Sequence, residues 1–185
     1  PLYFYHYEIH FSMIIAAVTL FILTGLSITA LYHRYYAHLS YSMKNKVLEA
    51  IMLFFATLAI QSSALSWSHN HRIHHRFVDK DEDPYSIKKG FWHAHILWLF
   101  KKRKPIDLNV VPDLMKNKLV VFQYKHYASL ALFSNLFVCG LIGWVLNDFI
   151  GAFFVAWWLR IFVAHHMTFF INSLACIFVP TKSIS

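Results

Sequence analysis

The chain has 185 residues, enough for one domain, and 58% of them are hydrophobic, with a mean hydropathy of +0.46. This apolar share is above that of an average soluble domain. The net charge of +8 would suit nucleic-acid binding, but 15 of the 17 Lys and Arg residues lie between Arg34 and Lys125, flanked by apolar runs. A basic segment of this kind is explained by neighbouring lipid headgroups, so we expect no nucleic-acid partner. Two cysteines, Cys139 and Cys176, are too few for a disulfide framework.

Three apolar stretches predict membrane-spanning helices, at residues of about 11–32, 127–146 and 149–171. The first contains 21 residues without a charge, and a helix of about 20 apolar residues crosses the roughly 30 Å hydrocarbon core. An Asn-Asp turn separates the other two, which we expect to form a hairpin. The sequence thus predicts an all-α integral membrane protein with a single domain. The basic residues place the region of about 33–126 on the cytoplasmic side.

The apolar stretch from Val47 to Trp67 is almost long enough to be a further span. If it crossed the membrane, the histidines before and after it would lie about 30 Å apart on opposite faces. The flanking basic residues would also be divided between the two sides, against the positive-inside rule. We therefore expect a helix that lies against or dips into the cytoplasmic side, packed in protein. Its polar residues fit that environment better than lipid: Glu49, Gln61, Ser62, Ser63 and Ser66.

Histidines are concentrated in two groups that indicate a metal site. In a helix, His71, His74 and His75 fall at positions i, i+3 and i+4, so three imidazoles line one face and can converge on one ion. His33 and His38 follow the first span with i, i+5 spacing, which suits a shared site only where the helix ends or is distorted. Imidazole binds iron, zinc, copper and nickel, so the spacing alone does not identify the metal.

The topology predicts which further polar residues reach the same side of the membrane. The two later spans return the chain to the face that it left, so His165, His166 and Asn172 are expected beside the two histidine groups. His93 and His95 are two residues apart and cannot face one ion from a regular helix. For this pair, packing at the membrane interface and a role behind the metal ligands are both open.

Two basic features also have simple explanations. Arg160 lies near the end of the last span, and we expect its long side chain to extend to the membrane surface. The run Lys101–Lys104 suits a solvated or lipid-facing patch, or a clamp for a phosphorylated substrate carrier.

Taken together, these motifs closely resemble the integral-membrane acyl-CoA fatty acid desaturases of the Δ9, stearoyl type, in their bacterial branch. The resemblance covers nearly the whole chain, because the matching segments occur in order and with the family's spacing. These segments are Gly25–Thr29, His33-x4-His38, His71-x2-His74-His75, Asp83–Trp92, Val111–Leu114 and the Asn-Ser pair at Asn172.

The resemblance implies a site with two iron ions. Its ligands would be His33, His38, His71, His74 and His75, with Asn172 reaching one iron through a water molecule. It also implies that Gln61, Trp67 and Thr168 line the bend of an acyl tunnel, and that Lys102 and Arg103 lie near the phosphates of the carrier.

The implied reaction is the O2-dependent insertion of a cis double bond into a long acyl chain. The carrier would be CoA, acyl carrier protein or a phospholipid, and the electrons would come from a ferredoxin or a cytochrome b5 type of donor. No protein side chain abstracts hydrogen from an unactivated C–H bond, so a redox metal must supply that step. In a bacterium, the protein would lie in the inner or plasma membrane, with the histidine groups on the cytoplasmic face.

The chain departs from the family pattern at two points. The family has another histidine four residues after the Asn, where this chain has Cys176, and a third His-x2-His-His motif that does not occur within the 185 residues. We therefore expect a partial sequence that is inactive alone. Three alternatives stay open: a membrane di-iron hydroxylase, a decayed paralogue that binds lipid or metal without turnover, and a transporter. A transporter would carry polar residues at mid-membrane depth, whereas these histidines follow the spans.

Overall fold

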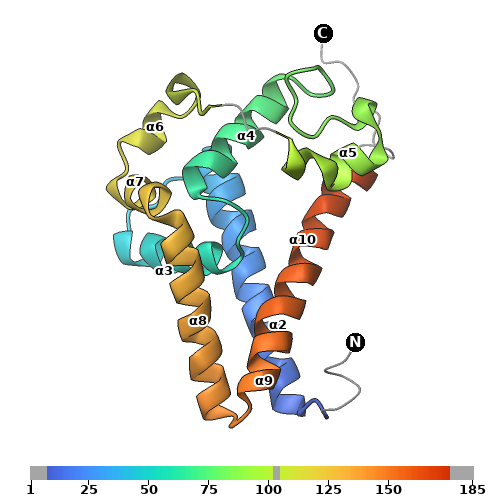
Figure 1. The fold of residues 1–185 in the computed structure, drawn as a ribbon. Helices are drawn as coiled ribbons and strands as arrows, with labels where there is room; N and C mark the ends of the chain where they lie inside the picture. Colours follow the sequence, from blue (N-terminus) through green and yellow to red (C-terminus); the bar gives the residue numbers. More distant parts are fainter. Residues whose placement is uncertain (1–7, 102–104, 176–185) are drawn as a thin grey trace.

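The computed structural model describes residues 8–101 and 105–175, and within these ranges it contains helices and no strands (Figure 1). Three helices are long and apolar enough to cross a membrane: Phe11–Ala37, Tyr127–Val145 and Phe149–Leu174. The predicted class, an all-α integral membrane protein, is therefore confirmed. Lys102, Arg103 and Cys176, which the sequence singled out, lie outside the described residues.

The first span is longer than predicted, because it continues beyond residue 32 to the histidines. It consists of α2 (Phe11–Ser27) and a π-helical continuation, η1 (Ile28–Ala37). At its end the His38 N–H donates to the His33 carbonyl over 3.0 Å, an i to i+5 bond that closes a wide turn. The wide turns bring the two imidazoles to one side of the helix, with ring centroids 4.5 Å apart. This is the distortion that the i, i+5 spacing requires.

The predicted single helix before the main histidine group is wrong in one respect, because the chain forms two helices there. They are α3 (Lys46–Leu58) and α4 (Ala64–Arg76), and between them the chain turns through Ile60 and Ser62 with φ of 53° and 82°. The Ser63 hydroxyl then caps α4 by accepting from the Ser66 N–H. At 13 residues α3 is too short to cross a membrane, and it lies across α8 in Figure 1 rather than alongside it.

Short helices and single turns connect α4 to the second span. They are η2 (Ile87–Lys89), α5 (Phe91–His95), η3 (Leu97–Phe100), η4 (Leu108–Val110), α6 (Pro112–Met115) and α7 (Lys118–Lys125). In Figure 1 this part of the chain covers the end of the spans at which α4 lies.

The second and third spans form a tight hairpin. The second is α8 (Tyr127–Val145), and the third is a continuous helix made of α9 (Phe149–Gly151), η5 (Ala152–Leu159), α10 (Arg160–Phe170) and η6 (Ile171–Ala175). The turn between them has Asn147 at φ 52°, and the Asp148 side chain caps the new helix by accepting from the Gly151 N–H over 2.7 Å.

A buried glutamine joins the helices around the histidine groups. The Gln123 amide on α7 donates to the Tyr32 hydroxyl over 2.6 Å and to the Thr57 hydroxyl over 2.8 Å, and its oxygen accepts from the Ala64 N–H over 2.8 Å. One side chain therefore connects the first span, α3 and the start of α4. Because a buried amide costs free energy unless its groups are bonded, these contacts favour a single arrangement of the four elements.

Arg160 does not reach the membrane surface, so the expectation for this side chain is wrong. It is 4% exposed and donates to the Leu58 carbonyl over 3.2 Å and to the Asn135 side-chain oxygen over 2.8 Å. Leu58 is the last residue of α3, where the helix dipole leaves partial negative charge on the carbonyls. Arg160 therefore finds polar partners inside the bundle and connects the third span to α3 and α8.

Candidate metal centre

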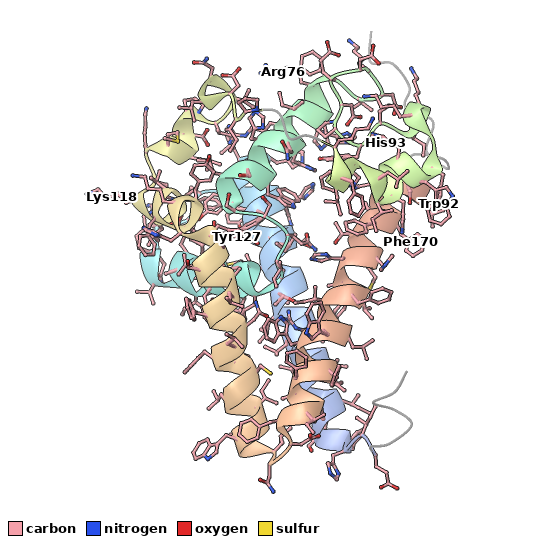
Figure 2. The ribbon with its side chains drawn as sticks, viewed as in Figure 1. Arg76, Trp92, His93, Lys118, Tyr127 and Phe170 are labelled. Carbon is pink, nitrogen blue, oxygen red and sulfur yellow. The ribbon has the colours of Figure 1, made fainter. Side chains whose placement is uncertain are left out.

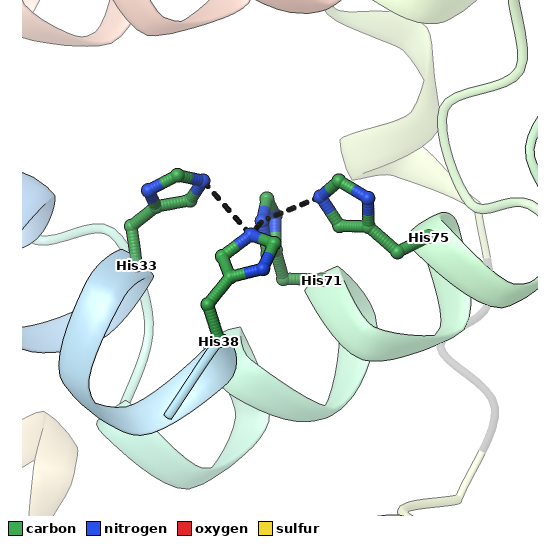
Figure 3. Close-up of side chains that lie close together, drawn as sticks. All are labelled: His33, His38, His71 and His75. Atoms are coloured by element: carbon green, nitrogen blue, oxygen red, sulfur yellow. Dashed lines mark hydrogen bonds between the residues drawn. The ribbon is translucent and has the colours of Figure 1, made fainter. Parts of the chain in front are cut away.

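Four imidazoles from two helices converge beside the end of the first span (Figure 3). His33 and His38 come from the end of η1, and His71 and His75 come from one face of α4. The Nε2 atom of His38 lies 3.1 Å from that of His33 and 3.0 Å from that of His71, and the His71 and His75 Nε2 atoms are 3.0 Å apart. All four ligand atoms lie within 4.8 Å of one another.

The chemistry of this group fits a transition metal. Two imidazole nitrogens on one ion, each about 2.0–2.1 Å from it, lie about 3 Å apart when they are neighbours, which matches the closest separations here. Burial and the adjacent His75 ring lower the pKa of His71 to about 2, and burial also lowers the pKa of His75. These rings are therefore neutral at pH 7, and neutral imidazole is the form that binds metal.

His74 lies outside this group of four and has a different polar partner. Its Nδ1 atom is 2.9 Å from a carboxylate oxygen of Asp83, which is buried. Burial alone would raise the pKa of Asp83, but hydrogen bonds from His74 and from the Asp79 and Tyr85 N–H groups lower it overall. A carboxylate on Nδ1 fixes the tautomer and leaves Nε2 available, as is common for metal-binding histidines. Sequence reasoning assigned no role to Asp83, although it stands in the matching segment Asp83–Trp92.

The pair His93 and His95 is buried in protein rather than exposed at an interface. The Nε2 atom of His93 lies 3.2 Å from the Pro84 carbonyl oxygen. His95 lies 3.2 Å from both His166 Nδ1 and Ser173 Oγ, so it connects α5 to the third span. Neither residue, nor His166, belongs to the group of four converging ligands found in the described part of the chain.

A cavity of about 360 Å³ opens beside the histidines. His33 and His71 form part of its wall, and His165 and Asn172 from the third span form another part. Of the three residues expected here from the third span, His165 and Asn172 line this cavity, whereas His166 lies against His95. Trp67 also lines the cavity and stacks on the His71 ring, with centroids 4.7 Å apart and planes at 21°.

A second cavity, of about 480 Å³, continues from the first between the first and third spans. The two cavities share Ile28, Thr29, Gln61, Thr168 and Ile171 as lining residues. At this junction the Gln61 amide donates to the Thr168 hydroxyl over 3.0 Å. The two cavities therefore adjoin, both are lined mainly by apolar side chains, and the first reaches the imidazoles. Such a space can hold a long apolar molecule. Gln61, Trp67 and Thr168, which the sequence singled out, all line it.

Arg72 fixes the relative position of the two histidine-bearing segments, and sequence reasoning assigned it no role. Its two terminal nitrogens each lie 2.7 Å from one carboxylate oxygen of Asp113. The same nitrogens donate to the Val110 carbonyl over 2.8 Å and to the Tyr36 carbonyl over 2.6 Å, and Nε donates to the Ala37 carbonyl. A residue next to His71 thus bonds the backbone next to His38. The one sequence feature that could have indicated this role is the position of Arg72 directly after His71.

The fold and this cluster define an integral membrane protein with a histidine-rich site for a transition metal beside an apolar cavity. The sequence profile of the fatty acid desaturase family matches residues 11–178. The match covers most of the chain, so the chain belongs to the fatty acid desaturase family.

Named relatives agree with this assignment. The chain is 40% identical over 169 residues to a probable acyl-CoA desaturase of Schizosaccharomyces pombe, and this alignment covers 88% of this chain and 34% of the relative. It is 35% identical over 173 residues to acyl-CoA desaturase 1 of Saccharomyces cerevisiae, an alignment that covers 90% of this chain and 33% of the relative. It is 37% identical over 164 residues to delta-9 acyl-lipid desaturase 1 of Arabidopsis thaliana, an alignment that covers 85% of this chain and 51% of the relative. The chain therefore spans about a third to a half of the length of these relatives.

Proposed function

We propose that this protein is a fatty acyl desaturase, an oxidoreductase that uses O2 to insert a cis double bond into a long acyl chain. The observation that carries the proposal is that two adjoining, mainly apolar cavities meet the converging imidazoles at one of them. Family membership and the names of the relatives support the same activity.

The metal of the proposed site is iron, as two ions. His33, His38, His71 and His75 would hold one ion, and His74 with Asn172, the latter through water, would contribute to the other. Iron would supply the O2-dependent redox chemistry that removal of hydrogen from an unactivated C–H bond requires. Zinc binds similar ligands but has no redox chemistry, so it does not serve this reaction.

The residues around the proposed ions would position the substrate and keep the site dry. The stacked Trp67 ring limits the movement of His71, and Asp83 holds His74 through its Nδ1 atom. The bridge between Gln61 and Thr168 lies where the two cavities join. A chain threaded past this bridge would be held at a defined depth relative to the imidazoles, with water excluded by the apolar walls.

For the carrier we propose CoA, with Lys102 and Arg103 near its phosphates, and for the reductant a ferredoxin or a cytochrome b5 type of protein. The yeast relatives are named for acyl-CoA and the Arabidopsis relative for acyl lipid, so a lipid-linked chain is the competing substrate. Acyl carrier protein is a third possibility. The basic segment around the site also leads us to propose that it faces the cytoplasm.

The test combines fatty acid analysis of expressing cells with iron analysis of the purified protein. We expect iron in the protein, and new unsaturated acyl chains when the chain is expressed joined to a segment that carries a third His-x2-His-His motif, with loss of both on H71A. His126 is exposed and lies outside the cluster, so H126A is the matched control and should retain both. Hydroxylated product would instead indicate a membrane hydroxylase. An iron-containing protein with neither product would indicate a non-catalytic paralogue and refute the proposal. Assays with acyl-CoA, acyl carrier protein or phospholipid substrates then identify the carrier.

A further inference from the structure

An open groove of about 970 Å³ lies on the outer side of α3, away from the proposed metal centre. One wall comes from the first half of α3 and the other from α6 and the start of α7. The residues that matter for its chemistry are Lys46, Val47, Ile51, Phe54, Lys116 and Lys118. Lys118 lies on the outside of the molecule beside α7 (Figure 2).

The floor of the groove is an exposed apolar stripe. Val47, Ile51 and Phe54 are spaced i, i+4 and i+7, so they share one face of α3, and they are 69%, 49% and 39% exposed. Leu53 and Ala56 on the same helix are buried against the rest of the protein. Helix α3 therefore has a satisfied inner face and an apolar outer face that no residue of the described chain covers.

The rim of the groove carries positive charge without a matching negative charge. The Lys46 amine lies 2.7 Å from the buried Glu49 carboxylate, which balances it, and Asp113 is paired with Arg72. Lys116 and Lys118 take part in no ion pair among residues 8–101 and 105–175. Two uncompensated lysines thus stand beside the apolar floor.

The position of the groove relates it to the membrane surface. Helix α7, which begins at Lys118, leads directly into the second span at Tyr127. Helix α3 packs across that span near the same end. The rim therefore lies at the depth of lipid headgroups, while the floor of α3 faces the space where acyl chains begin. Lysines at this depth attract anionic lipid.

We propose that this groove binds an anionic phospholipid. The phosphate lies between Lys116 and Lys118, and one acyl chain runs along Val47, Ile51 and Phe54. An acidic protein surface would satisfy the two lysines but would leave the apolar stripe without a partner, so the lipid fits the whole groove better. The lipid site is separate from the metal centre and does not depend on the proposed reaction.

The test measures lipid retention on protein in nanodiscs that contain equal amounts of phosphatidylglycerol and phosphatidylcholine. Native mass spectrometry after release from the disc counts the lipids of each kind that stay bound. We expect phosphatidylglycerol to be favoured about thirtyfold, because each of the two lysines at the membrane surface favours anionic lipid by roughly 1 kcal/mol. K116Q/K118Q should reduce this preference to nearly equal retention.

The control K80Q/K88Q removes the same amount of charge from exposed lysines outside the groove and should keep the preference. Equal losses in both double variants would mean general electrostatic attraction and would overturn the proposal. I51N makes the floor polar without changing the charge, and it should reduce phosphatidylglycerol retention several-fold. If I51N has no effect and high salt alone removes the lipid, only the charged rim is used. That result would favour an acidic protein partner and reject the lipid site.

Discussion

Replacement of Arg72 by methionine should separate the two halves of the histidine cluster while leaving every imidazole in the sequence. The guanidinium donates two hydrogen bonds to the Asp113 carboxylate. No other side chain can replace it, because only Arg presents this planar fork of donors. It also bonds three backbone carbonyls, those of Tyr36, Ala37 and Val110. R72M therefore removes the contacts that hold the end of η1 against α4.

The magnitude follows from those contacts. Three backbone bonds at about 1 kcal/mol each and a partly exposed ion pair at up to about 1 kcal/mol give a loss of roughly 3–4 kcal/mol in the free energy of unfolding. Part of this loss should appear as weaker metal binding, because the separation of 3.0 Å between the His38 and His71 Nε2 atoms depends on the same contact between segments. We expect R72K to recover only part of it.

The assay is the iron content per chain together with the thermal unfolding of the purified protein. R76M is the matched control, since Arg76 lies one turn along α4, is exposed (Figure 2), and has the same charge. It should keep both the iron content and the unfolding temperature. If R72M binds iron as the unchanged protein does, or if R76M loses as much iron, then Arg72 does not position the two segments.

Three further predictions concern the packing around the site. Burial raises the pKa of Glu49, but three hydrogen bonds lower it below its ordinary value of 4.5. Its stabilising effect is therefore present above pH 4.5 and is lost as the pH falls through the folded pKa, and an E49Q variant should lose this part of the pH dependence in unfolding experiments. T168V should lower the free energy of unfolding by about 1 kcal/mol in thermal unfolding experiments, because the half-buried Gln61 amide loses its acceptor. R160M should cost about 3 kcal/mol by leaving the Asn135 side-chain oxygen and a helix-end carbonyl unpaired, and thermal unfolding of R160M/N135L should show less than the sum of the single effects.

Much of the architecture could be predicted because it depends on local patterns. Runs of apolar residues are long enough to span a bilayer, and this property does not require knowledge of the neighbours. Helix α3 is too short to cross a membrane, as distance and charge alone predicted. The break in the predicted helix between α3 and α4 was missed, since positive φ at Ile60 and Ser62 arises from the packing of the turn rather than from residue types that favour it.

The sequence by itself determined which side chains are available for a metal: helical spacing puts His71, His74 and His75 on one face of α4, and the resemblance points to His33 and His38 as their partners. Only the tertiary structure decided how they meet. The π-helical turns align His33 with His38, the Arg72 contacts hold η1 against α4, and Asp83 binds His74 outside the group of four. The tertiary structure also decided that Arg160 lies inside the bundle, where it donates to a carbonyl at the end of α3 and to the Asn135 side chain. No local sequence pattern encodes these bonds. The physical reason is the same in each case: periodicity fixes the face of a helix on which a residue lies, whereas hydrogen bonds between distant segments fix what that face meets.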